Sequence, residues 1–198
     1  MGEVTGGGLH RRAAVARLLE GRDDLLVVTG LGSPTYDVFA AGDHPGNFYL
    51  WGAMGGAAMM GLGLAKARPE RPVVVVTGDG EQLMGLGGLA TISLQAPANL
   101  SIVVLDNGHF GETGGQMSHA GAGVDLAQVA RACGIAEVTT VTDMDGVEGA
   151  RGAIGTVGAG PRFIVLRIVN EETSRALPSR DGVWLKARMR THLGLSPN

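Results

Sequence analysis

Two apolar runs constrain the fold of this chain more than any other feature. Residues 73–76 are four consecutive valines, and residues 102–105 are equally apolar, with no polar position in either run. Such runs are typical of strands buried on both faces of a parallel sheet. Similar runs alternate with helical patterns along the chain. We therefore predict an α/β fold of three layers, in which helices cover both faces of a mainly parallel sheet.

The other elements are predicted from the same patterns. We expect further strands at residues 25–29, 48–51, 137–141 and 163–169. Helices are expected at residues 9–19, 54–67, 81–95, 124–132, 147–157 and 179–193, and a glycine-rich loop at residues 107–123. Neither a linker nor an internal repeat interrupts this order. We predict one domain over residues 1–198, with a flexible lead at 1–8 and a terminal helix at 179–193.

Composition excludes several classes of protein. The net charge of −3 and the scattered basic residues are unlike the basic face of a nucleic-acid-binding protein. The single cysteine, Cys133, rules out an internal disulfide, fits a reducing compartment and so predicts a cytoplasmic protein. The uncharged segment at residues 44–65 is too short in its strongly apolar part for a membrane span. We expect neither a nucleic-acid partner nor a membrane.

Two candidate metal ligands follow the two buried strands. Asp79 lies between Gly78 and Gly80, and Asn107 follows the second run. In a parallel sheet these strand ends share the edge where ligands bind. A carboxylate and an amide oxygen suit Mg²⁺, while bare glycine backbone and the N–H groups of a helix starting near Glu81 suit a diphosphate. The alternative is a helix-capping aspartate and an unrelated turn asparagine.

This pattern resembles the diphosphate-binding domain of thiamine diphosphate (ThDP) enzymes. Their motif is Gly-Asp-Gly followed, one strand later, by Asn-Asn, and here Asp106 takes the first of the two asparagine positions. The resemblance implies that ThDP and Mg²⁺ are the cofactors. It also implies that Asp79, Asn107 and the backbone carbonyl of His109 bind the metal, with Gly78, Gly80 and Glu81 beside the diphosphate.

A second segment agrees with the resemblance. Residues 50–55, Leu-Trp-Gly-Ala-Met-Gly, are similar to the segment that binds the aminopyrimidine ring in this family. By that likeness the carbonyl of Gly52 accepts a hydrogen bond from the pyrimidine amino group, and Met54 supports the bent cofactor. Taken alone, Met54 is more typical of a hydrophobic core, and it is the metal motif beside it that favours the cofactor role. The resemblance further places Gly32 and Thr35 near the diphosphate.

Within the family, the chain resembles sulfopyruvate decarboxylase β subunits and phosphonopyruvate decarboxylases. This similarity rests on residues 32–35, 43–49, 52–55, 106–108 and 113–116. It implies non-oxidative decarboxylation of a 2-oxo acid to an aldehyde. The candidate catalytic residues are His109, Glu112 and Thr113, in the loop after Asn107. Histidine is a common general acid and base, so His109 suits proton transfer, although its backbone alone could matter. Glu112 could be a solvated loop residue.

The resemblance also implies a partner. ThDP enzymes need a glutamate beside the pyrimidine, and in the family this residue lies on a separate pyrimidine-binding domain. A chain of 198 residues has room for only one such domain. We therefore expect a hetero-oligomer with a small pyrimidine-binding (α) subunit that supplies the glutamate.

Three alternatives remain at this point. A ThDP-dependent carboligase would use the same residues and join the substrate to a second carbonyl compound. A dinucleotide-binding dehydrogenase requires Gly-x-Gly-x-x-Gly, but residues 30–35 lack the third glycine. A non-catalytic subunit would keep only the fold, and the presence of Asp79, Asn107 and Met54 argues against it.

Overall fold

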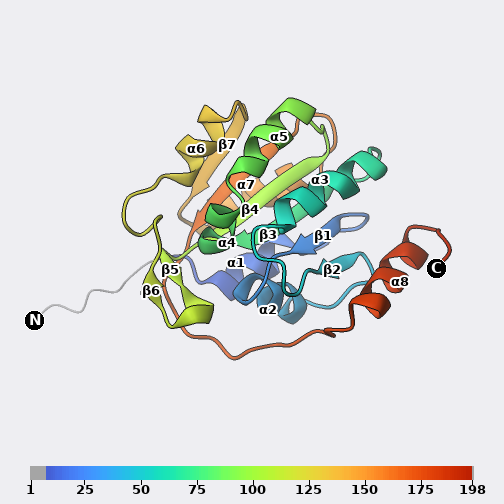
Figure 1. Cartoon of the computed structure of the whole chain (residues 1–198), viewed down its shortest axis with the longest axis horizontal. Helices are drawn as coiled ribbons and strands as arrows, with labels where there is room; N and C mark the ends of the chain where they lie inside the picture. The colour runs from blue at the N-terminus through green and yellow to red at the C-terminus, as the bar shows by residue number, and fades with distance from the viewer. Residues whose placement is uncertain (1–7, 198) are drawn as a thin grey trace, which may run out of the picture.

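The computed structural model describes residues 8–197 and contains one six-stranded sheet (Figure 1). The strands lie in the order β2-β1-β3-β4-β8-β7, and every pair of neighbours is parallel. Their bounds are β1 Leu26–Thr29, β2 Asn47–Tyr49, β3 Val73–Gly78, β4 Leu100–Asp106, β7 Glu137–Val141 and β8 Arg162–Arg167. The predicted parallel α/β fold is confirmed.

Helices cover both faces of the sheet. One hydrophobic cluster packs α1 (Arg11–Leu18), α2 (Ser33–Ala40) and α7 (Met144–Ile154) against one face. A second cluster packs α3 (Ala57–Ala67), α5 (Gly87–Gln95) and α6 (Leu126–Ala132) against the other. The short α4 (Asp79–Met84) continues directly from β3, and α8 (Gly182–His192) packs beside the edge strand β2. These are the three predicted layers.

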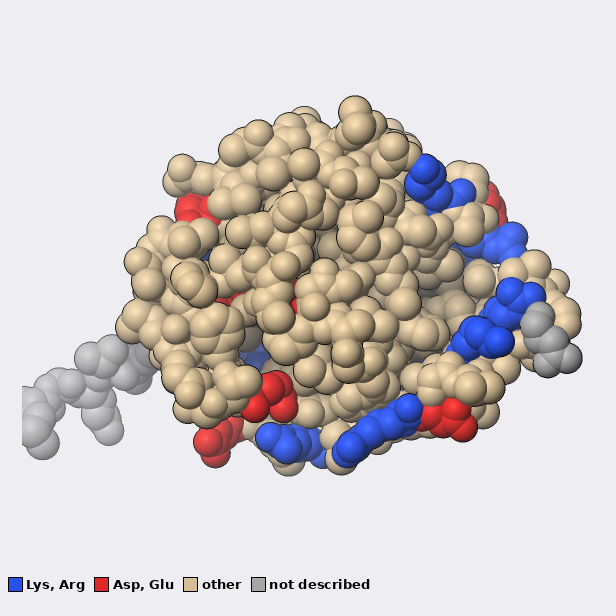
Figure 2. All heavy atoms as spheres, in the orientation of Figure 1, with Lys and Arg blue, Asp and Glu red and all other residues tan. Residues whose placement is uncertain are grey.

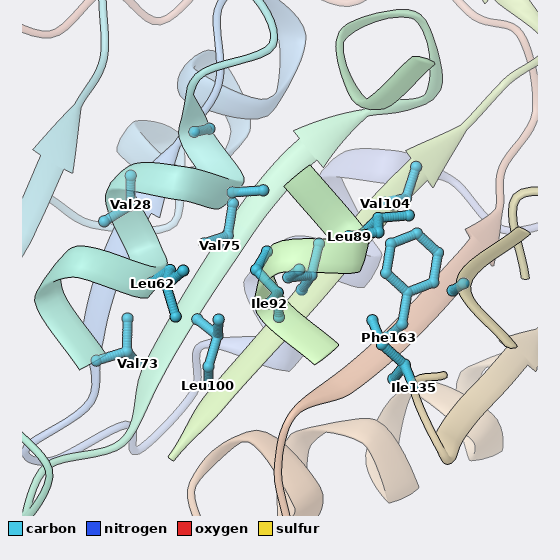
Figure 3. Packing of buried hydrophobic residues seen from close by; sticks show 14 of the residues in the cluster. Val28, Leu62, Val73, Val75, Leu89, Ile92, Leu100, Val104, Ile135 and Phe163 are labelled. Atoms are coloured by element: carbon cyan, nitrogen blue, oxygen red, sulfur yellow. The ribbon is translucent and has the colours of Figure 1, made fainter. Parts of the chain in front are cut away.

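The two apolar runs lie in the centre of the sheet. Every residue of β4 is buried, and β3 is buried from Val73 to Thr77. Figure 3 shows Val75, Val104 and Phe163 facing Leu89 and Ile92 of α5. Burying aliphatic side chains of this size contributes roughly 1.5–3 kcal/mol each. The apolar faces therefore fix β3 and β4 side by side, and their carboxyl ends come to one edge.

Several predicted boundaries differ in the structure. The helix expected at 81–95 is two helices, because the chain turns at Gly85, where a Cβ atom would lie 2.4 Å from the carbonyl oxygen of Gly55. Helix α2 was not predicted. The loop at 107–123 contains a hairpin of β5 (His109–Phe110) and β6 (Gln116–Met117), joined by a 3₁₀ turn at Gly111–Thr113.

At the chain ends, the predicted boundaries lie closer to those of the structure. The terminal helix starts at Gly182 rather than at residue 179, because Asp181 caps it by accepting the N–H groups of Val183 and Trp184. The proposed flexible lead at 1–8 lies outside the described residues except for Gly8. In the part of the chain that the structure describes, no helix is long and apolar enough to cross a membrane.

Candidate functional site

The carboxyl edge of the sheet carries a cleft of about 80 Å³. Its position follows from the strand register, which places Gly78 at the end of β3 beside Leu105 of β4. Nine of the predicted site residues line this cleft: Met54, Gly78, Asp79, Gly80, Glu81, Asn107, His109, Glu112 and Thr113. Segments far apart in the sequence thus meet at one place.

Asp79 is buried at the start of α4, with 2% of its surface exposed. Its Oδ2 accepts a hydrogen bond from the Ser118 hydroxyl at 2.5 Å. Burial raises the pKa of Asp79, the hydrogen bond from Ser118 opposes this shift, and the nearby charge of Asp106 adds to it. Backbone hydrogen bonds from Asp79 and Gly80 also lower the pKa of this carboxyl group.

The Asn107 side chain is oriented by two hydrogen bonds. Its Oδ1 accepts the backbone N–H of His109 at 3.0 Å, and its Nδ2 donates to Oδ1 of Asn170 at 3.2 Å. The His109 ring folds back toward the backbone of Asn107, with Nδ1 at 2.8 Å from the Asn107 carbonyl oxygen. That contact suits an N–H at Nδ1 and leaves Nε2 as the second ring nitrogen.

Glu81 joins α4 to the loop after β1. Its Oε2 accepts the backbone N–H of Leu31 at 2.9 Å, and a Cβ atom on Gly30 would lie 1.7 Å from the same oxygen. Burial raises the pKa of Glu81, and the hydrogen bond from Leu31 lowers it. The predicted site residue Glu81 therefore fixes the glycine-rich loop against the start of α4.

The remaining predicted residues lie around the cleft but do not line it. Thr35 is fully buried, and its hydroxyl donates to the Gly30 carbonyl oxygen at 2.5 Å. It therefore stabilises the turn after β1 and does not face the cleft. Gly32 precedes α2 with φ +76° and lies under the Glu112 side chain. Gly52 is exposed with φ +75°.

Glu112 and Thr113 lie on the exposed 3₁₀ turn. The Glu112 carboxylate is 3.9 Å from the Arg175 guanidinium. A second, polar cavity of about 500 Å³ lies here, and Glu112 and Asn107 line both cavities. The two cavities therefore adjoin, with Glu112 between them.

The residues of the cleft fit Mg²⁺ and a diphosphate. Carboxylate and amide oxygens are hard donors of the kind that Mg²⁺ prefers. The backbone at Gly78 is open, since a Cβ atom there would meet nothing nearer than Pro34 at 4.0 Å. At Gly80 a Cβ atom would lie 2.6 Å from the Phe110 ring, so glycine is required between the metal-ligand candidate and this ring.

Sequence reasoning missed three residues here. Ser118 holds Asp79, Phe110 packs over Gly80, and Arg167 pairs with Asp106. Ser118 and Phe110 lie in a glycine-rich loop whose path no periodic pattern predicts. Arg167 follows an apolar strand, but only the register identifies its partner.

Comparison with known proteins gives the family. Residues 35–167 match the family model described as "Thiamine pyrophosphate enzyme, C-terminal TPP binding domain", thiamine pyrophosphate being another name for ThDP. Among solved structures, an enzyme of Mycobacterium smegmatis described as thiamin diphosphate-dependent superposes with a TM-score of 0.69 at 25% identity. That superposition covers 82% of this chain and 32% of the other.

Two relatives of known name are more similar in sequence. The "Sulfopyruvate decarboxylase subunit beta" of Methanothermobacter thermautotrophicus is 44% identical over 64% of this chain and 67% of its own length. The "Phosphonopyruvate decarboxylase" of Streptomyces viridochromogenes is 50% identical over 65% of this chain. The match covers only 32% of that longer protein.

Proposed function

This chain belongs to the thiamine pyrophosphate enzyme family, and we propose that it is the ThDP- and Mg²⁺-binding subunit of a split 2-oxo acid decarboxylase. One observation carries the proposal. Asp79 and Asn107 lie on one cleft that Met54 also lines, although the three residues come from different segments. The family model covers this whole region, from residue 35 to residue 167.

The predicted site residues then have distinct tasks. Asp79, Asn107 and the His109 carbonyl would hold Mg²⁺, and backbone N–H groups at the start of α4 would bind the diphosphate. Gly52 and Met54 would hold the pyrimidine end. Bound ThDP supplies a thiazolium that accepts the electron pair released as CO₂ leaves.

Proton transfer is assigned to the loop after Asn107. With the Nδ1–H group of His109 directed at the Asn107 carbonyl, Nε2 would have to be protonated as well, and this imidazolium would donate its Nε2 proton to the product carbon and regain one from solvent. Thr113, which lines the cleft, would orient the substrate. Glu112, between the two cavities, would repel an anionic substrate unless its charge is offset by Arg175 at 3.9 Å. The names of the relatives support a pyruvate-like substrate carrying a sulfonate or phosphonate group.

The partner in this proposal is a small pyrimidine-binding subunit. The same domain is a separate β subunit in Methanothermobacter and about a third of one longer chain in Streptomyces, which supports a second polypeptide for the remaining functions. Figure 2 shows a broad area with few charged side chains over α3 and α5, where the exposed apolar residues include Met59, Met60 and Leu94. Apolar areas of this kind commonly mark contact surfaces. We place the complex in the cytoplasm.

Calorimetry tests the cofactor assignment. The wild-type chain, with the β subunit's natural partner present, should bind ThDP when Mg²⁺ is added and not when Mg²⁺ is chelated. Asp79→Ala should abolish this metal-dependent binding, while Asp125→Ala, which removes an exposed helix cap, should preserve it. Equal binding by wild type and Asp79→Ala would refute the metal site.

Product analysis tests the reaction. The complex should release CO₂ and an aldehyde from sulfopyruvate or phosphonopyruvate. Adding a second aldehyde should leave the product unchanged, whereas an acyloin product would identify a carboligase instead.

A further inference from the structure

Two strand ends meet beside Asn107. Asp106 is the last residue of β4, and its register partner on β8 is Arg167. The Asp106 side chain is 0% exposed, and its Oδ2 forms an ion pair with Nη1 of Arg167. Its Oδ1 accepts the backbone N–H of Gly108 at 3.1 Å. One buried carboxylate thus connects Arg167 to the turn that carries Asn107.

The path continues from this turn to Asp79. The Gly108 carbonyl accepts the backbone N–H of Ser118 at 2.8 Å, and the Ser118 hydroxyl donates to Asp79 at 2.5 Å. Gly121 packs on the same turn so closely that a Cβ atom on it would lie 2.4 Å from the Gly108 carbonyl oxygen. An unbroken series of contacts therefore joins Arg167 to Asp79, in a loop with little room to shift.

The charge on Asp106 makes Arg167 necessary. A buried carboxylate without a cation is strongly unfavourable, and here it would also act on the nearby Asp79. An amide at position 106 could accept the Gly108 N–H without needing a cation. The need for Arg167 should therefore depend on whether residue 106 carries a charge.

We propose that Arg167, Asp106 and Ser118 are positioning residues that hold the Asn107 turn and one oxygen of Asp79 in the arrangement a divalent cation requires. The inference rests on the proposed function, because the cation is the one assigned to Asp79 and Asn107. Outer-shell contacts of this kind typically change metal affinity by about 10–100-fold.

Mg²⁺ titration of ThDP binding tests the proposal in three variants of the chain, with its partner present. Arg167→Met should raise the Mg²⁺ concentration for half-maximal binding by about tenfold or more. The double variant Asp106→Asn/Arg167→Met should return to within about threefold of wild type, since the two changes are coupled. Arg162→Met is the matched control: Arg162 starts the same strand but bonds to Thr156 at the opposite edge.

A merely structural role predicts another result. Arg167→Met would then lower the melting temperature as Arg162→Met does, with Mg²⁺ dependence unchanged. Unchanged Mg²⁺ dependence in Arg167→Met, or a double variant as weak as Arg167→Met alone, would overturn the proposal.

Hydrogen exchange of the cofactor-free protein separates this inference from the proposed function. Arg167→Met and Ser118→Ala should speed exchange across residues 107–121, and the double variant should restore protection. If the variants show this exchange pattern but the wild-type protein fails to bind Mg²⁺ and ThDP, the proposed function is refuted and the positioning contacts are supported. Wild-type exchange rates in Arg167→Met would refute the positioning contacts, whatever the protein binds.

Discussion

At the scale of single residues, close packing on one side of Asp79 leaves room only for glycine at position 80. Gly80 follows Asp79 directly, and the Phe110 ring lies where a side chain at position 80 would go. Neither residue is charged, and neither is expected to touch the metal. The ring fixes the distance between the start of α4 and the hairpin after Asn107, so the size of residue 80 should control the geometry of the cleft.

Gly80→Ala tests this control. The added methyl group must displace Phe110 or the helix, so we expect a loss of about 1–3 kcal/mol in the free energy of unfolding and at least tenfold weaker Mg²⁺-dependent ThDP binding. Gly87→Ala is the matched control, since nothing lies within 4 Å of a Cβ atom at that helical position. Gly87→Ala, at the first residue of α5, should not lower the free energy of unfolding. Equal cofactor affinity in the two variants would contradict the packing argument.

At the scale of helices and strands, the C-terminal segment is joined to the rest of the fold by polar contacts. After β8 the chain runs without helix or strand past α2 to α8 (Figure 1). Trp51 donates from Nε1 to the Ser179 carbonyl oxygen at 2.9 Å. On α8, Arg188 pairs with Asp43 at 2.6 Å and lies over the Trp184 ring. Leu185 and Met189 bury the apolar side of α8, and Asp181 caps its first turn.

Asp181→Ala should weaken α8 selectively. Loss of the cap leaves two N–H groups without their acceptor and should cost about 1 kcal/mol of unfolding free energy. Asp181→Asn keeps the acceptor and should unfold like wild type. Urea unfolding checks both values, and an Asp181→Asn variant as unstable as Asp181→Ala would show that the charge rather than the cap matters.

The elements also show how far the sequence alone determines the fold. The strands at 73–76 and 102–105 were predicted because burial on both faces leaves an unbroken apolar run. Helix α2 was missed because its sequence, Ser-Pro-Thr-Tyr-Asp-Val-Phe-Ala, has little helical periodicity, and its packing against α1 and β3 stabilises it instead.

For the candidate site, motif spacing together with the family resemblance predicted residues that meet at the cleft, but not the residues that support them. Asp79, Asn107 and Met54 were identified in advance and line one cleft. The Ser118 contact to Asp79 depends on the path of the hairpin loop, which is fixed by tertiary contacts rather than by local pattern. The roles of the predicted residues toward a cofactor stay predictions.

At the scale of the whole molecule, charge is distributed unevenly. Charged side chains gather at the rim of the face in Figure 2, and the α3–α5 area between them is largely uncharged. In the sequence, residues 82–105 contain no Asp, Glu, Lys or Arg. The opposite side of the sheet instead carries ion pairs such as that between Arg17 and Glu148. This asymmetry is what a subunit with one covered face would require.

A histidine pair beside α8 should make the stability of the whole fold depend on pH. The rings of His44 and His192 lie 5.2 Å apart, edge to face. Burial lowers the pKa of both, and Arg71 lowers both further. Arg22 also lowers the pKa of His44, and Asp43 raises it. Arg188 also lowers the pKa of His192, and Asp24 raises it.

The sign of the effect follows from these directions. Because each folded pKa is below the unfolded value near 6.5, the unfolded chain binds more protons in mildly acidic solution. The stabilisation that the two neutral histidines contribute to the folded state is complete above about pH 6.5. It is lost as the pH falls toward their pKa values in the folded protein. Buried carboxyls with raised pKa, such as Asp37, titrate in the opposite sense, so the effect of the histidines must be measured as a difference between variants.

His192→Gln isolates that difference, because glutamine can accept the hydrogen bond from Arg71 without titrating. The free energy of unfolding of wild type, relative to His192→Gln, should fall as the pH is lowered from 7.5 to 5. The carboxyls are common to both proteins and cancel. If the free energy of unfolding varies with pH in parallel for wild type and His192→Gln, then burial and Arg71 do not lower the pKa of His192 in the folded protein.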